Sequence, residues 1–238
     1  MISAAFNAVI YVPLYNGLVF LMDLVPWADA GVSVVIFTFL VKLALFPISQ
    51  KAVRTGLRMK ALEGDLAALK ERHKDDREAH AKATVAFYKE KNVNPFSSVF
   101  LALIQIPIIL GLYYIFYRGG LPNIKTELLY SFVSMPKVSM HFLGLIDITK
   151  GSLLLALLVA ASQYFQVRFA MPAPKPKPVG APSMKDDFAR TMSLQMRYFL
   201  PAMVGVIAYN ISGAVSLYWI TSNLFAIGQE IYVRRTFL

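Results

Sequence analysis

Hydrophobic residues along this chain gather in long runs that are separated by shorter polar segments. A hydrocarbon core about 30 Å thick needs about 20 helical residues, so runs of nearly this length are typical of transmembrane helices. The pattern therefore predicts an all-α integral membrane protein with a five-transmembrane-helix core. The predicted spans are 31–48, 96–117, 152–169, 194–210 and 214–233, of which the fourth is the shortest.

Residues 49–95 form the one strongly polar block, and its apolar positions follow a helical period. Polar residues 73–76 interrupt this period, so we expect two antiparallel helices joined by a turn. Asn94 and Pro95 suit an N-cap and a first helical position, and they mark the start of the second span. The first helix carries a heptad seam with steps of three, four and three residues, at Met59, Leu62, Leu66 and Leu69.

Residues 1–30 contain no basic residue, and apolar side chains recur near helical spacing from Phe6 to Leu21. We expect an N-terminal amphipathic helix that lies in the membrane interface on the external side, with a sixth span as the alternative. A cleaved signal peptide is not expected, because such peptides begin with positive charge. Residues 118–151 and 170–193 are predicted loops, and the second is rich in proline.

The basic residues divide unequally between the predicted loops, and this division sets the expected topology. Of the 24 lysines and arginines, eleven lie in 49–95, six between Arg168 and Arg197, and two in the tail 234–238. Short cytoplasmic loops concentrate such residues. We therefore expect an outside N-terminus, with the hairpin, the Pro-rich loop and the C-terminus in the cytoplasm. The absence of cysteine excludes a disulfide framework.

Lys42 lies alone in the apolar run from Val32 to Phe46, with Thr38 one helical turn before it. An ionisable residue at such depth costs about 2.5 to 3.5 kcal/mol on insertion scales, and it normally marks function. Helical side chains lean toward the helix N-terminus, so Lys42 is expected to point away from the nearer cytoplasmic water. Its ammonium group then needs water or oxygen atoms from other spans.

The other predicted spans offer such oxygen atoms, and none of them carries a deeply placed acid. These residues predict a hydrophilic cavity with net positive charge, while hydrogen bonds between helices are the alternative use for the serines. The candidate partners are Gln105, Ser162, Gln163, Ser216, Thr221, Ser222 and Asn223.

No signature of an enzyme occurs in the sequence. The histidines, His73, His80 and His141, lie outside the predicted spans, and no span contains aspartate. The chain lacks a phosphate-binding P-loop, a His-Glu-x-x-His metal helix and a dinucleotide glycine motif. We therefore expect a protein that is not an enzyme, uses no cofactor and works without ATP hydrolysis.

Four short motifs follow one another along the chain. They are Thr38-Phe-Leu-Val-Lys42 with Pro47, Asn94-Pro95 with Gln105-Ile-Pro107, Phe142-Leu-Gly-Leu-Ile-Asp147, and Ser212 to Trp219 with Ser222-Asn223-Leu224. With these motifs the chain resembles the YidC/Oxa family of membrane protein insertases from Tyr11 to Arg235. The resemblance implies five core helices around a groove that opens to the cytoplasm and lipid and is closed outside. It also implies a basic groove residue at Lys42, where members usually have arginine.

By this resemblance the chain is expected to insert and chaperone nascent membrane proteins in a prokaryotic inner membrane. It is expected to be a minimal form without the large periplasmic domain of many members, because only about 30 residues precede the first span. Thr38 and Trp219 are expected to line the substrate path, with Tyr218 beside them. The full expected groove set is Lys42, Thr38, Gln105, Gln163, Tyr218, Trp219 and Asn223.

Basic residues of the hairpin are expected to recruit partners, and an ordinary solvated helical face is the alternative. Candidate partners are the ribosome, the Sec translocon, components of the signal recognition particle pathway and anionic lipids, but not DNA. Two other functions stay open, namely a small-solute or anion transporter with Lys42 as ligand and a non-catalytic assembly scaffold. The candidate recruitment residues are Arg54, Arg58, Lys60, Lys70, Arg72 and Lys74.

Overall fold

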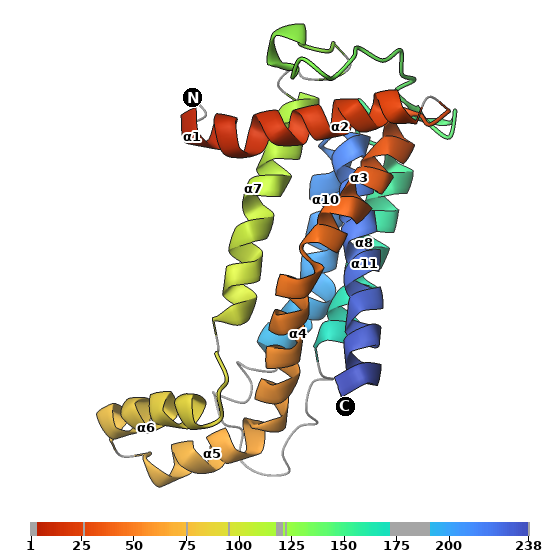
Figure 1. Cartoon of the computed structure of the whole chain (residues 1–238). Helices are drawn as coiled ribbons and strands as arrows, with labels where there is room; N and C mark the ends of the chain where they lie inside the picture. Colours follow the sequence, from red (N-terminus) through yellow and green to blue (C-terminus); the bar gives the residue numbers. More distant parts are fainter. Residues whose placement is uncertain are drawn as a thin grey trace. The chain divides into compact units, whose positions relative to one another are not determined.

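The computed structural model describes residues 4–25, 27–74, 76–94, 96–117, 121, 123–171 and 191–237. It is mostly helical (Figure 1) and divides into two compact units. Unit 1 comprises 1–43 and 107–230, and unit 2 comprises 44–106 and 231–238. The predicted first helical residue Pro95 and most of the predicted Pro-rich loop, 172–190, lie outside the described residues.

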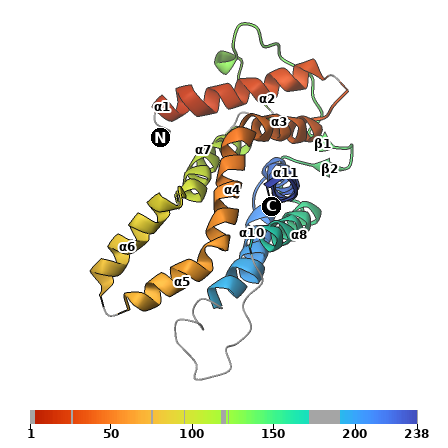
Figure 2. The same ribbon diagram turned by 60° about the horizontal axis from the view of Figure 1, so that its bottom comes forward.

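Unit 1 is a bundle of helices with one helix lying across its end (Figures 1 and 2). The crossing helix is continuous through α1 (Ala4–Phe6), the π-helical turn η1 (Asn7–Tyr11) and α2 (Val12–Leu24). The helices of the bundle are α3 (Ala30–Ala44), the second part of α7 (Ser97–Tyr117), α8 (Leu153–Ala170), η3 (Gln195–Phe199), α10 (Leu200–Tyr209) and most of α11 (Gly213–Phe237).

The core of unit 1 forms where the crossing helix meets the bundle. Its buried side chains come from α2, α3, α7 and α11, and they include Tyr15, Leu18, Met22, Val34, Leu112, Ile115 and Tyr218. Helices α8 and α10 pack through small residues instead. A Cβ added to Gly205 would lie 2.9 Å from the Ala160 Cβ, so the two backbones approach closely there.

The segment between α7 and α8 is fastened to unit 1 by a buried asparagine. Asn16 donates Nδ2 to the Leu128 carbonyl at 2.8 Å and accepts the Tyr130 N–H on Oδ1 at 2.6 Å. These bonds satisfy polar groups that burial would otherwise penalise. The segment contains the 3₁₀ turn η2 (Thr126–Leu128) and an antiparallel pair of short strands, β1 (His141–Phe142) and β2 (Ile146–Asp147), in which Phe142 pairs with Ile146.

Helix α11 begins against the end of this segment. The Gly213 N–H donates to the Lys150 carbonyl at 2.8 Å, and the Ala214 N–H donates to the Ile148 carbonyl at 3.1 Å. These bonds satisfy two of the backbone donors that every helix start leaves unpaired. The approach is so close that a Cβ on Gly151 would overlap the Tyr209 carbonyl oxygen.

We expect Gly151→Ala to destabilise the protein by about 1–3 kcal/mol, because the added methyl group overpacks a backbone contact. Thermal unfolding in detergent, followed by circular dichroism, measures the effect. Gly64→Ala is the matched control, because nothing lies within 4 Å of a Cβ at that helical site. The control should be neutral or stabilising by up to about 1 kcal/mol. Equal unfolding temperatures for the two variants would contradict the tight contact at Gly151.

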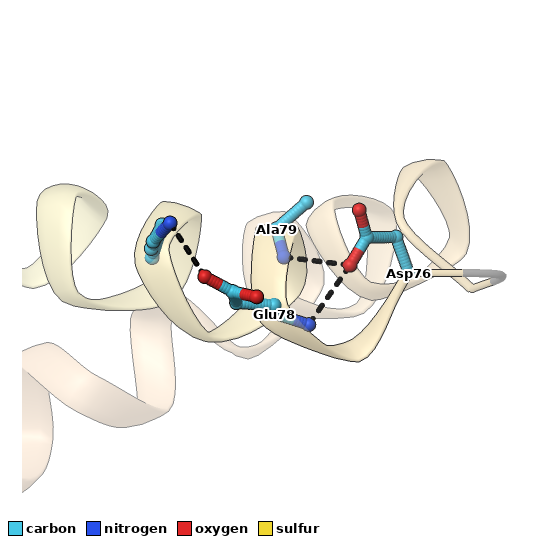
Figure 3. A network of polar contacts seen from close by, with 4 residues as sticks. Asp76, Glu78 and Ala79 are labelled. Carbon is cyan, nitrogen blue, oxygen red and sulfur yellow. Dashed lines mark hydrogen bonds and ion pairs between the residues drawn. The ribbon is translucent and has the colours of Figure 1, made fainter.

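Unit 2 contains α4 (Phe46–Ala61) and two further helices, α5 (Glu63–Arg72) and α6 (Arg77–Glu90), which contact each other. Asp76 caps α6, because its Oδ1 accepts the N–H groups of Glu78 and Ala79 at 2.9 Å (Figure 3). Such a cap contributes about 1 kcal/mol to a helix. The last turns of α11 also belong to this unit and contact α4.

The helix predicted over 31–48 is two helices in the structure, because α3 ends at Ala44 and α4 begins at Phe46. Pro47 explains the break: proline lacks the N–H of a helical bond and its ring clashes with the preceding turn. Within the described ranges, Ala4–Leu24 and Leu153–Ala170 are long and apolar enough to cross a membrane, and α3 with α4 is a third candidate if counted as one broken span. The five-span count and the interfacial placement of the first helix stay predictions.

Candidate functional site

Lys42 lies in the last turn of α3 and is half-buried. Thr38, one turn earlier, is fully buried, and its hydroxyl donates to the Val34 carbonyl at 2.6 Å. The threonine is therefore satisfied by its own helix, and its hydroxyl oxygen keeps a lone pair for a further donor. The same face of α3 carries a basic group and a hydroxyl inside a helix whose other residues, apart from Ser33, are apolar.

This face of α3 meets α11 through an aromatic pair, because the Phe39 and Phe225 rings lie 5.6 Å apart edge to face. The two helices run in the same direction in Figure 1. Lys42 follows Phe39 by three residues, and Gln229 follows Phe225 by four, so both lie about one turn beyond the aromatic contact. We infer that Lys42 and Gln229 lie at a similar level of the bundle.

Sequence reasoning missed two polar residues of α11, Gln229 and Glu230. Their exposed fractions are only 7% and 9%, so Glu230 places a carboxylate where the sequence predicted no buried acid. A signal was present: each follows a polar residue of the expected set, Ser222 or Asn223, by seven positions. Residues seven apart lie on one face of a helix, so this spacing extends the polar face toward the helix end.

Polar residues of α8 and α11 meet inside the bundle. Asn223 donates Nδ2 to the Ser162 Oγ at 3.1 Å, and both side chains are buried. The Ser216 hydroxyl bonds the Ala208 carbonyl of α10 at 3.4 Å. For Ser162 and Ser216 these contacts fit the interhelical hydrogen bonds that the sequence left open as an alternative. Gln163 is half-buried and donates to Gln166 on its own helix at 3.4 Å.

The two neighbouring aromatic residues of α11 lie in different surroundings. Tyr218 is buried in the main core of unit 1. Among the described residues, its hydroxyl has no partner apart from the hydroxyl of Ser222, one turn later. Trp219 is partly buried and packs against Ala156, Val159 and Ala208 of α8 and α10. The structure therefore does not place Tyr218 and Trp219 together on the wall of one groove. Gln105 is half-buried and belongs to unit 2, whereas the other residues of the predicted groove set belong to unit 1.

One of the predicted recruitment residues has a structural contact instead. The Arg54 guanidinium lies 3.2 Å from the centre of the Phe237 ring at the end of α11, and its Nε is buried without a hydrogen-bond partner among the described residues. Such a cation–π contact stabilises packing. The exposed members are Arg58, Lys70, Arg72 and Lys74, whereas Lys60 is partly buried.

The acid at the end of β2 is held by local donors. The Asp147 carboxylate accepts the Thr149 hydroxyl at 2.6 Å and the Thr149 N–H at 3.0 Å, and these bonds hold the pKa of Asp147 below its ordinary value. Among the described residues, no group of three or more histidine or acidic side chains is placed to hold a metal ion.

Apolar helices, a half-buried lysine and buried polar contacts between helices define an α-helical membrane protein. The family model described as 60Kd inner membrane protein matches residues 20–238, and the chain belongs to this family, the YidC/Oxa family.

Curated relatives share this assignment. A membrane protein insertase YidC from Clostridium tetani is 26% identical over 88% of this chain and 84% of its own length. The inner membrane protein ALBINO3 of Arabidopsis thaliana chloroplasts is 29% identical over 89% of this chain, and a YidC from Francisella tularensis is 28% identical over 93% of it. The chain spans 47% and 37% of the length of these two longer relatives.

Proposed function

We propose that this protein is a membrane protein insertase and chaperone that moves nascent membrane proteins into the bilayer through a polar groove, without ATP hydrolysis. The observation that carries the proposal is the half-buried Lys42 on an apolar helix, next to a helix with buried polar side chains. The relatives from Clostridium and Francisella carry the name membrane protein insertase, which supports the same activity.

The proposed mechanism lowers the barrier to crossing in two ways. A hydrated groove accepts the hydrophilic tail of a substrate part-way, and the positive charge of Lys42 attracts acidic residues of that tail. Once the tail has crossed, burial of the apolar substrate helix in lipid drives the process at about 25 cal/mol per Å². The interhelical bond of Asn223 and the polar residues beside it would line the route.

The proposed membrane placement has five spans, with α3, α7, α8, η3 with α10, and α11 crossing the bilayer. The N-terminus lies outside, the C-terminus lies in the cytoplasm, and the membrane is a prokaryotic inner membrane. Figure 1 supports an interfacial first helix, because α2 crosses the bundle of unit 1 instead of running along it. The positive-inside distribution of the basic residues supports the orientation.

The proposed role of the α5–α6 hairpin is to recruit cytoplasmic partners. Its exposed basic side chains offer attraction to ribosomal RNA or to anionic lipids, and the Sec translocon and signal recognition particle components are further candidates. Arg54 is not part of this surface in our proposal, because it contacts Phe237.

The test is insertion of a radiolabelled single-span protein into liposomes that contain the purified chain, with no nucleotide present. Protease protection of the substrate reports insertion. We expect protection well above that of empty liposomes, and depletion of residual ATP should leave it unchanged. Insertion equal to that of empty liposomes would reject the insertase proposal and favour a transporter or a scaffold.

A further inference from the structure

The motif Phe142 to Asp147 has no role in the mechanism above, and it forms a turn that exposes leucine side chains. Leu143 and Leu145 are 64% and 83% exposed, in a tight connection between β1 and β2. The Gly144 N–H bonds the His141 carbonyl, and the Leu145 N–H bonds the Phe142 carbonyl at 3.0 Å. The turn is therefore ordered by its own backbone bonds, and it presents apolar groups to the surroundings.

The turn is also strained at a leucine. Leu143 has φ of 54° and Gly144 has φ of 73°, so both central residues adopt the left-handed conformation. Glycine and asparagine adopt this conformation readily, whereas leucine pays a steric penalty. Solvent exposure gives no compensation for an apolar, strained residue. An exposed apolar residue in a strained conformation is expected where its side chain contacts a partner or surface outside the folded chain.

The turn is fixed to the start of α3. The Asp29 carboxylate accepts the Val32 N–H at 2.8 Å on one oxygen and the Leu143 N–H at 2.7 Å on the other, so it joins the helix start to the turn. Phe142 packs so closely on Gly31 that a Cβ there would lie 2.7 Å from the phenylalanine Cβ. The height of the turn along the bundle is therefore set by the end of a proposed membrane-spanning helix.

Other exposed apolar residues surround this place. Trp27, two residues before Asp29, is 79% exposed, and Figure 2 shows β1 and β2 projecting sideways beyond the ends of α3 and α8. The first residues of α8, a few positions after β2, also carry exposed apolar side chains, Leu153, Leu154 and Leu157. Tryptophan and leucine in this arrangement are typical of the membrane interface.

The charges nearby are compatible with a phospholipid surface. The Asp29 carboxylate is occupied by two backbone donors, and Asp147 pairs with Lys150 at 3.4 Å. Lys150 is itself exposed, as is Lys137. The charge of Asp147 is therefore balanced by Lys150, the Asp29 carboxylate is held by backbone donors, and the exposed Lys137 adds a positive charge that favours phosphate head groups.

We infer that the β1–β2 turn, together with Trp27, is a membrane anchor that inserts Leu143 and Leu145 into the phospholipid interface beside the starts of α3 and α8. The anchor holds these two helices at a fixed depth, which keeps the closed end of the proposed groove in register with the bilayer. The inference rests on the proposed membrane placement of α3 and α8, but not on insertase activity.

A depth measurement tests the anchor. The chain has no cysteine, so Leu145→Cys creates a unique labelling site for the fluorophore nitrobenzoxadiazole in the full-length protein. The labelled protein is reconstituted into phosphatidylcholine and phosphatidylglycerol vesicles. We expect blue-shifted emission, protection from iodide, and stronger quenching by lipids spin-labelled near the head group than by lipids labelled near the chain end. Insertion about 5–10 Å below the surface produces this pattern.

Two comparison variants sharpen the result. Glu127→Cys labels an exposed residue of η2 in the same connecting segment and should show water-like emission with full iodide quenching. Leu143→Asn in the Leu145→Cys background keeps the turn, because asparagine tolerates positive φ, and should increase iodide quenching of the label.

Three outcomes would overturn the anchor. Iodide quenching at position 145 equal to that at 127 would mean that the turn stays in water. A blue shift without any quenching by spin-labelled lipid would mean that protein covers the turn. A blue shift that disappears when the protein is diluted in excess lipid would mean that a second copy covers it. If the unmodified protein gave no more insertion than empty liposomes while the depth pattern was as expected, the proposed function would be rejected and the anchor would stand.

Discussion

Lys42→Leu is expected to reduce insertion of substrates with short acidic tails by about thirtyfold. At an effective dielectric constant of about 20, two unit charges about 8 Å apart attract by about 2 kcal/mol, and this difference in barrier corresponds to about a thirtyfold change in rate. Leucine keeps the apolar bulk of the half-buried side chain, so the loss measures the charge and not a cavity. The initial rate of protease-protected product in liposomes gives the value.

Three controls isolate the charge of Lys42. Lys42→Arg should retain or improve activity, because arginine stays charged in any surroundings. Lys51→Leu removes one charge from an exposed site of α4 and should change the rate little. A substrate whose tail acids are replaced by amides should be insensitive to Lys42→Leu, so the two changes form a double-mutant cycle. Equal losses with acidic and neutral tails would rule out charge attraction.

The helical class could be predicted from the sequence because apolar runs and helix signals coincide. Ser152 precedes an apolar run, and in the structure its Oγ accepts the Leu155 N–H at the start of α8. The break at Leu45 was also predictable in principle, since Pro47 stands two residues later. The apolar run through Ile48 instead favoured one continuous helix over 31–48. A run of apolar residues does not indicate where a helix bends.

The site was predictable only at the level of single residues. Lys42 is conspicuous in any hydropathy pattern, but the pairing of Asn223 with Ser162 joins residues 61 positions apart, and it depends on how α8 and α11 are rotated. Rotation also separates Tyr218 from Trp219, because successive helical residues point about 100° apart. The burial of Glu230 was not predictable, because its place near basic residues is typical of a cytoplasmic helix end.

The second large effect is expected on the α5–α6 hairpin. Replacing residues 63–90 by a short glycine-serine linker should abolish binding of ribosomes that carry a nascent membrane protein. Each lysine or arginine close to an anionic surface contributes about 1 kcal/mol, so neutralising Lys70, Arg72 and Lys74 together should weaken binding by about 3 kcal/mol, or about a hundredfold. These three side chains are exposed, and the only ion pair that they form among the described residues is between Lys74 and Glu71. Cosedimentation with ribosomes at rising salt measures the affinity.

The matched variant neutralises Arg77, Lys82 and Lys89 on α6, which removes the same charge from the same hairpin. If both triple variants weaken binding equally, net charge and not the α5 surface recruits the ribosome. Insertion of released substrate into liposomes distinguishes recruitment from the groove, because the deletion should leave it nearly unchanged while Lys42→Leu reduces it. The opposite pattern, with insertion lost on deletion and unaffected by Lys42→Leu, would identify the protein as a scaffold whose activity resides in its partners.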